Sequence, residues 1–185
     1  MIAALLFALA AAPQPRLDQM SLAKLRARIV LTEVMEEGDS KGAARGLAIA
    51  RCAPAAVFAV LTDHSKFAEF MPRIAAVEVS RRTDTGERAL QTVDATLATV
   101  RYALDYRWDP AALRVEFTLA EDVPRDIKAA RGSWQLWALD GGKSTLIEYR
   151  TAADIGRWVP GPVRRYLQTS GVRDAVEAIR RRAER

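Results

Sequence analysis

The sequence predicts an α+β domain in which a curved antiparallel sheet wraps around one long C-terminal helix. Apolar and polar residues alternate with a period of two through most of the stretch from Val77 to Tyr149, a pattern typical of half-buried strands. A long stretch, Val163 to Arg182, contains no helix breaker except Gly171 and follows a Pro-Gly-Pro start signal at residues 160–162. Two short helical stretches precede the long run of strands. This order predicts one helix covering one face of the sheet.

Size and composition indicate a single globular domain. The chain has 185 residues, enough to bury a substantial core, and it shows no internal repeat. Hydrophobic residues make up 50% and charged residues 28%, a balance typical of globular domains. One cysteine, Cys52, excludes an internal disulfide, and one histidine, His64, argues against a histidine-rich metal site. We therefore expect no metal and no cofactor.

The first twelve residues are almost wholly apolar and end in small side chains before Pro13. The run is too short to span a bilayer, but it matches the hydrophobic region of a secretory signal peptide, with small-residue cleavage choices at Ala8, Ala10 and Ala12. No lysine or arginine precedes it, so an ordinary apolar terminus or a misassigned start codon is the alternative. The prediction is a signal peptide over residues 1–12 and an exported or periplasmic protein; otherwise the location is cytoplasmic.

The remaining chain divides into a lead-in and one domain. Residues 13–28 form a polar, mildly helical lead-in, and residues 29–185 form the domain. A period of two begins at Ile29, a turn is expected over residues 38–42, and Leu47 to Cys52 return as the second strand of a hairpin.

Two short helices are expected after this hairpin. Pro54 suits the first turn of a helix, and Asp63 or Ser65 can cap a second one that carries Phe67 and ends before Pro72.

The strands that follow share one apolar, aromatic face. The clearest alternation runs from Val100 to Trp108, and the next runs from Leu113 to Leu119. Gly132 reopens the sheet, the Asp140 to Lys143 segment predicts a hairpin turn, and Thr145 to Tyr149 supply the last inner face.

The final helix has an apolar row at i, i+4 spacing: Val163, Leu167, Gly171, Ala175, Ile179 and Ala183. Because four residues turn about 400°, the row drifts by roughly 40° a step and winds around the helix, which suits a curved sheet. Ser170, Gly171 and Ala175 make its middle small. Small side chains there either let the sheet approach closely or leave room for a ligand cavity.

Three segments carry a resemblance to a known family: APAAVFAVLTDHSKFAEFMP at Ala53–Pro72, GSW at Gly132–Trp134 and RRYL at Arg164–Leu167. With the element order, they resemble the START-like or SRPBCC superfamily, in particular its polyketide cyclase/dehydrase group with the coenzyme Q-binding and ribosome association toxin families. The resemblance extends from about Leu47 to the C-terminus and implies the helix-grip fold. That scaffold serves lipid carriers, hormone receptors, cyclases and partner-binding proteins, so the resemblance specifies fold more closely than function.

No catalytic constellation is apparent in the sequence, so we predict no catalytic residue and expect binding rather than an enzyme. His64 lies between the two short helices without a recognisable Ser or Cys nucleophile, and we interpret it as a polar loop histidine. Cys52 follows a strand and is interpreted as a small core residue. The sequence has no glycine-rich phosphate loop.

A ligand cavity between the aromatic sheet face and the small middle of the last helix is the functional hypothesis. An empty cavity of ~300 Å³ would cost about 7 kcal/mol, comparable with the stability of a domain, so such a cavity should hold a ligand. The expected ligand is a lipid, quinone or polyketide-like molecule whose polar head the Tyr hydroxyls and Trp N–H groups orient. The alternative is that these aromatic side chains simply fill a core. The predicted ligand-binding residues are Phe67, Phe70, Tyr102, Leu104, Tyr106, Trp108, Val115, Phe117, Trp134, Leu136, Ile147, Tyr149, Leu167, Ser170, Gly171 and Ala175.

The C-terminal end is basic, with arginines at positions 157, 164, 165, 173, 180, 181, 182 and 185. They predict either a solvated outer helix face or contact with an anionic membrane surface, and nucleic acid is not expected. Two alternatives to lipid binding follow from the family resemblance: a polyketide cyclase/dehydrase-type enzyme, or a basic partner-binding module of the ribosome association toxin type. Export would argue against ribosome binding.

Overall fold

The computed structural model describes residues 13–37, 40–94, 99–154 and 161–185, with side chains over 13–35, 43–94, 99–154 and 170–185. The predicted signal peptide, residues 1–12, lies outside the described residues. The elements in chain order are α1 Gln19–Arg26, β1 Leu31–Glu37, β2 Ser40–Ala50, α2 Pro54–Leu61, the 3₁₀ helix η1 His64–Lys66, α3 Phe67–Phe70, β3 Ile74–Thr83, β4 Gly86–Asp94, β5 Thr99–Asp109, β6 Arg114–Leu119, β7 Ala129–Leu139, the 3₁₀ turn η2 Asp140–Gly142, β8 Ser144–Asp154 and α4 Gly161–Ala183.

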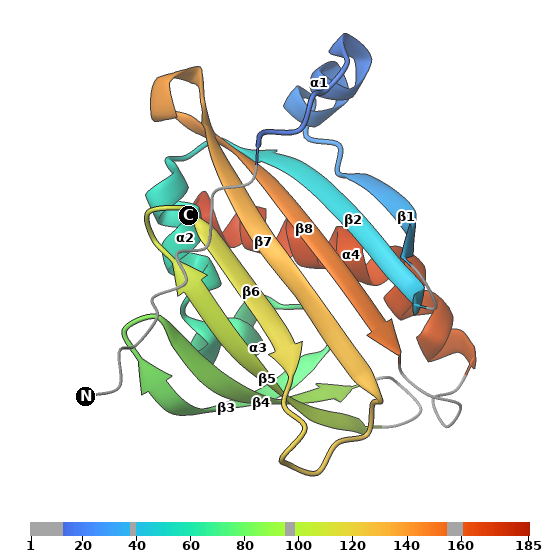
Figure 1. Ribbon diagram of the computed structural model, residues 1–185. Helices are drawn as coiled ribbons and strands as arrows, with labels where there is room; N and C mark the ends of the chain where they lie inside the picture. The colour runs from blue at the N-terminus through green and yellow to red at the C-terminus, as the bar shows by residue number, and fades with distance from the viewer. Residues whose placement is uncertain (1–12, 38–39, 95–98, 155–160) are drawn as a thin grey trace.

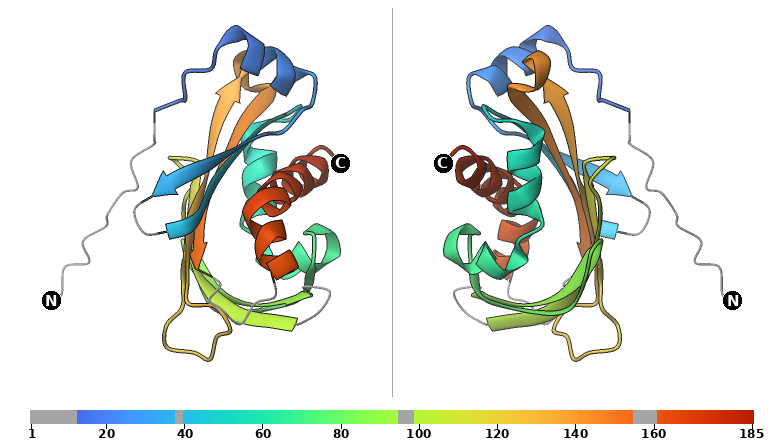
Figure 2. Two further views of the ribbon diagram at one scale, coloured as in Figure 1. Left: turned by 90° about the vertical axis from the view of Figure 1, so that its right-hand side faces the viewer. Right: turned by 90° about the vertical axis from the view of Figure 1, so that its left-hand side faces the viewer.

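The strands form one antiparallel sheet of eight, in the order β1-β2-β8-β7-β6-β5-β4-β3. The sheet curves, and α4 lies in its concave side together with α2 and α3 (Figures 1 and 2). This confirms the predicted fold class: a curved antiparallel sheet around a long C-terminal helix, with short helices after the first hairpin. The first hairpin is tighter than expected, because β2 already begins at Ser40.

Strand register places the predicted aromatic residues on the concave face. Trp108 of β5 pairs with Val115 of β6, Val115 pairs with Trp134 of β7, and Trp134 pairs with Tyr149 of β8. Directly paired residues point to the same side of a sheet, so all four side chains share one face. The hairpin between β7 and β8 turns where Gly141 and Gly142 adopt positive φ values of 68° and 86°, a conformation that favours glycine.

Helix α4 packs closely against β2 at Gly46. A Cβ atom added to Gly46 would lie 2.8 Å from Val172 Cγ1 and 2.9 Å from Val176 Cγ2, closer than side chains approach. The buried positions of α4 include Ala175 and Ile179 of the predicted row, together with Val172 and Val176, which that row does not contain. The glycine therefore lies on the strand, opposite two valines of the helix.

The convex face of the sheet has a smaller core of its own beneath α1. Leu25 of α1 is fully buried and packs with Leu47, Ile49 and Leu146. The Asp18 side chain caps α1 by accepting a hydrogen bond of 2.8 Å from the Ser21 N–H. The lead-in thus contributes a helix that covers one end of the convex face. Within the described part of the chain, no helix combines the length and hydropathy needed to cross a membrane.

Candidate functional site

Four aromatic side chains form a continuous row across the concave face of the sheet. Phe117 lies between two tyrosines, with its ring centroid 5.7 Å from that of Tyr106 and 6.2 Å from that of Tyr149. Tyr149 in turn stacks on Trp134 at 4.0 Å with an interplanar angle of 13°. We call Tyr106, Phe117, Tyr149 and Trp134 the aromatic row. Its members come from β5, β6, β8 and β7, so the row spans the centre of the sheet.

Gly132 makes the row possible. It pairs with Phe117 across β6 and β7, and the Phe117 ring occupies the space where a side chain at position 132 would stand. A Cβ there would also collide with the Arg150 carbonyl oxygen. The GSW segment thus combines a glycine that admits the Phe117 ring with a tryptophan that stacks on Tyr149.

Two tyrosines of the concave face are deep within the protein and still accessible. Burial raises the pKa of both Tyr102 and Tyr149, and the nearby Tyr149 phenol adds to the shift at Tyr102. Both residues nevertheless keep part of their surface exposed, whereas their neighbours Leu104 and Ile147 are buried. Part of the concave face of the sheet is therefore accessible at these two side chains.

The accessible positions of the concave face are grouped at one end. Val93, Ala130 and Ala153 are half-buried and lie where β4 and β8 end and β7 begins. At the opposite end, Trp108 and Leu136 are buried in the main core. The accessible part of the concave face therefore lies toward the end of the sheet marked by Tyr102 and Tyr149, and the side chains at the other end are packed in the core.

His64 of η1 and Glu87 of β4 form a buried polar pair. His64 Nδ1 is 2.7 Å from Glu87 Oε1, and the two side chains are only 1% and 0% exposed. The imidazole ring faces Tyr106 at a centroid distance of 3.6 Å and also contacts Phe67 at 4.7 Å. The interpretation of His64 as a polar loop histidine is therefore wrong. No sequence signal connects it with Glu87, 23 residues away, because the pairing depends on how η1 packs against β4.

The protonation state of this histidine follows from its burial. Desolvation lowers the pKa of His64, and the hydrogen bond with Glu87 opposes that shift without overcoming it. The imidazole is therefore neutral near pH 7. Arg82 Nε lies 3.5 Å from the second carboxylate oxygen of Glu87 and partly offsets its buried charge.

The expectation that Trp N–H groups orient a ligand is wrong for Trp108. Its indole Nε1–H donates a 3.0 Å hydrogen bond to the Asp84 carbonyl oxygen. Because an indole has one donor, this bond leaves Trp108 only an apolar surface to offer. The Tyr106 hydroxyl is also engaged, because Gln91 Nε2 donates a 2.8 Å hydrogen bond to Tyr106 Oη.

The structure brings most of the predicted ligand-binding residues together. Ten are buried in one core: Phe67, Leu104, Tyr106, Trp108, Val115, Phe117, Trp134, Leu136, Ile147 and Ala175. Tyr102, Tyr149 and Phe70 are partly buried against that core. Ser170 and Gly171 are half-buried, and the Leu167 side chain lies outside the described side chains. Sequence reasoning missed Gln91, Glu87 and Val93, which share this face; alternation along β4 is the signal that could have found them.

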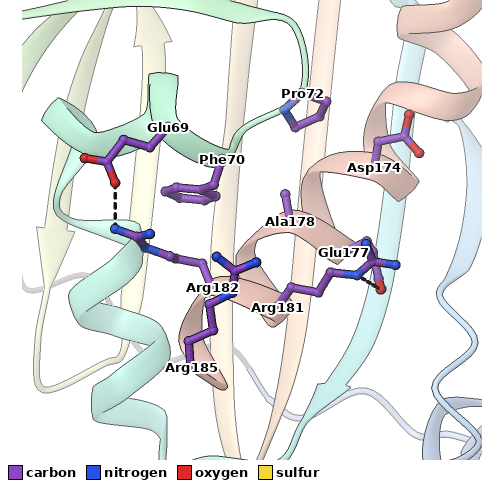
Figure 3. A pocket seen from close by; sticks show the side chains of 9 residues that line it. All are labelled: Glu69, Phe70, Pro72, Asp174, Glu177, Ala178, Arg181, Arg182 and Arg185. Carbon is purple, nitrogen blue, oxygen red and sulfur yellow. Dashed lines mark hydrogen bonds and ion pairs between the residues drawn. The ribbon is translucent and has the colours of Figure 1, made fainter.

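Phe70 lines a groove at the surface of the protein (Figure 3). This surface groove has a volume of about 420 Å³ and runs between α3 and the C-terminal part of α4. Its lining residues are Glu69, Phe70, Pro72, Asp174, Glu177, Ala178, Arg181, Arg182 and Arg185. Arg182 bonds to Glu69 at 2.8 Å and lies over the Phe70 ring at 5.4 Å, while Arg181 pairs with Glu177 at 2.7 Å. The lining contains three acidic and three basic side chains, so the groove has no single strong charge.

Cys52 lies apart from the aromatic row, at the end of β2. It is half-buried, and burial raises the pKa of its thiol, so the sulfur stays protonated near neutral pH. Its carbonyl oxygen accepts a 2.7 Å hydrogen bond from the Thr145 hydroxyl, which joins the chain after β2 to β8. Among the described residues, no group of three His, Cys, Asp or Glu side chains is placed to hold a metal ion.

Comparisons with known proteins agree with this architecture. The profile of a family described as polyketide cyclase / dehydrase and lipid transport matches residues 52–180. Solved structures with the same fold include the Zhui aromatase/cyclase from Streptomyces sp. R1128, with a TM-score of 0.65 and 19% identity over 77% of this chain and 93% of that one. A STAR-related lipid transfer protein from Xanthomonas axonopodis has a TM-score of 0.67 and 20% identity over 84% and 94%. A search of curated proteins gave no match.

Proposed function

The chain belongs to the polyketide cyclase/dehydrase and lipid transport family. We propose that it binds a lipophilic small molecule without chemically changing it, in a hollow between the concave face of the sheet and α4. The observation that carries the proposal is the accessible surface of Tyr102 and Tyr149, two tyrosines deep on the concave face. A hollow lined by aromatic and aliphatic side chains favours an apolar occupant, because its lining loses dispersion contacts when the space is empty. Members of the family bind hydrophobic ligands such as lipids and polyketides.

The buried histidine supports binding over catalysis. A general base must come within hydrogen-bond reach of the proton that it removes. His64 is 1% exposed, its Nδ1 is engaged by Glu87, and its ring is covered by Phe67 and Tyr106. A substrate in the hollow would meet the Tyr106 ring before it met the imidazole. Cyclisation of a polyketide-like substrate is therefore the alternative that the experiments below must exclude.

Two measurements test ligand binding. The first is native mass spectrometry of the protein purified from its own host, in which we expect a co-purified apolar molecule that is released unchanged. The second is titration with a hydrophobic fluorescent probe of the wild type and of Ala175→Leu. Ala175 is 8% exposed in the main core of the concave side. The larger side chain should weaken probe binding, with little change in the unfolding temperature.

Ala178→Leu is the matched control. It is the same substitution on the same helix, but Ala178 lines the surface groove. Probe binding should be unchanged in this variant. If Ala175→Leu instead loses about 1 to 3 kcal/mol of stability and binds the probe normally, the helix packs tightly at this position and the residue lines no ligand hollow.

Export is a further part of the proposal and rests on the apolar run of residues 1–12. We expect the mature protein in the exported fraction of its host to begin after Ala10 or Ala12. N-terminal sequencing of the protein from separated cell fractions checks this, and an intact Met1 in the cytoplasmic fraction would contradict it.

A further inference from the structure

Four of the residues that α4 contributes to the surface groove form one straight stripe along the helix. These residues, which all line the groove, are spaced at i, i+4, i+7 and i+11: Asp174, Ala178, Arg181 and Arg185 (Figure 3). At roughly 100° per residue, the four positions fall within about 60° of one another around the helix axis. This spacing is typical of the seam along which two helices pack side by side. The stripe therefore has the geometry of a helix–helix contact.

The middle of the stripe is small, and apolar side chains lie beside it. Ala178 is half-buried and lies between the charged ends of the stripe, so a second helix can approach α4 closely at this point. Phe70 and Pro72 line the same groove from the α3 side. Helices pack by placing the side-chain ridge of one into the groove of another. The apolar middle of the groove thus suits the ridge of a partner helix.

The charges on the stripe are ordered, with the acid at one end and the bases at the other. Asp174 lies roughly 16 Å along the helix axis from Arg185. Arg185 is exposed, and within the described part of the chain no ion pair engages its guanidinium group. Two α4 helices that run antiparallel about a two-fold axis midway between these positions place Asp174 of each copy opposite Arg185 of the other. A parallel pair would place like charges together, which is unfavourable.

We propose that the surface groove is a self-association surface, in which α4 of a second copy of the chain packs antiparallel on α4 with Ala178 near the two-fold axis. Each α4 then lies between α3 and α4 of the other copy, so one contact fills both grooves and closes the dimer. The three acidic and three basic side chains of the lining cancel, so the groove does not attract a strongly charged partner. Their order along α4 matches a second copy. The inference does not depend on the proposed ligand.

Sedimentation velocity over a range of protein concentrations tests the proposal by charge exchange. We expect the wild type to dimerise reversibly. Asp174→Arg and Arg185→Asp should each weaken dimerisation about tenfold or more, because each substitution turns both ion pairs between the copies into repulsions. An equal mixture of these two variants should form a dimer, since each supplies the charge that the other needs. The variant that carries both substitutions should dimerise as well.

Arg173→Asp is the matched control. It makes the same charge change as Arg185→Asp at an exposed residue of α4 that does not line the groove, so dimerisation should be unchanged. Circular dichroism and urea unfolding check that every variant is folded.

Three results would overturn the proposal. A wild type that stays monomeric at every concentration would mean that the charge order serves only the dipole of α4 itself. A dimer that persists in both single variants would have its interface elsewhere, and a mixture of the two variants that fails to associate would exclude the pairing of positions 174 and 185. Binding of the hydrophobic probe should be the same in monomeric and dimeric variants, so a loss of probe binding bears on the proposed function and not on the dimer.

Discussion

Replacing Gly46 by alanine should destabilise the protein, because two valine side chains of α4 pack directly against this glycine of β2. The new Cβ would lie 2.8 Å from Val172 Cγ1 and 2.9 Å from Val176 Cγ2, and both valine side chains are buried and β-branched. Overpacking of this kind costs about 1 to 3 kcal/mol, and the lower entropy of the unfolded alanine chain returns about 0.4 to 1 kcal/mol. We expect a net loss of about 0.5 to 2 kcal/mol.

A double-mutant cycle separates this contact from other effects of the substitution. Val172→Ala alone removes two methyl groups and should cost about 2 kcal/mol. In the double variant, Val172→Ala also removes the nearer collision with the new Cβ at position 46. The double variant should therefore lose less stability than the sum of the two single losses, by at least about 0.5 kcal/mol. Urea unfolding of the four proteins measures each free energy. A Gly46→Ala protein as stable as the wild type, together with additive losses in the cycle, would show that α4 does not press on β2 at this point.

Four further outcomes are expected. His64→Ala should cost about 3 kcal/mol or more in chemical unfolding, since Glu87 is left buried without its partner, and His64→Leu combined with Glu87→Leu should recover much of the loss. The pKa of His64 is lower in the folded than in the unfolded chain, so the unfolded chain binds the extra proton and stability should fall as pH decreases below about 6.5. His64 is the single histidine of the chain. The stability of His64→Gln should therefore stay constant between about pH 7 and pH 5.5. Leu25→Ala should cost about 2 to 5 kcal/mol in thermal or chemical unfolding if α1 is an integral part of the fold. Cys52→Ala should leave probe affinity unchanged, and a clear loss of binding in the folded variant would contradict the assignment of the thiol to packing.

The sheet could be predicted from the sequence because alternation specifies which face of each strand is buried. From Val100 to Trp108 the even-numbered residues are apolar or aromatic, and the register of β5 with β4 and β6 places them all on the concave side. Turn chemistry was equally informative at Gly141 and Gly142, which both adopt positive φ. These signals are local, and a few residues suffice to produce them.

The contacts that define the site depend on pairs distant in the sequence and could not be predicted in this way. The sequence predicts His64 as a polar residue in a short connection. In the structure, η1 packs against β4, so His64 is buried and contacts Glu87. Gly46 lies just before the return strand predicted from Leu47, whereas the structure places it within β2, where it leaves room for Val172 and Val176. The small residues of α4 predicted either close packing or a cavity at this helix. The close packing occurs at a glycine of the sheet, Gly46 of β2, against Val172 and Val176 of α4.

The arginines near the C-terminus show how a charge pattern in sequence can differ from the charge on a surface. Arg180 is 3% exposed, pairs with Glu177 and donates a 2.9 Å hydrogen bond to the Arg28 carbonyl oxygen, so it does not belong to a solvated outer face. Arg182 ties α4 to α3 through Glu69. These guanidinium groups neutralise carboxylates and connect elements of the fold, and therefore they contribute less to attraction toward an anionic membrane than their number suggests. The proposed apolar ligand on the concave face would account for the accessible tyrosines without requiring a basic surface.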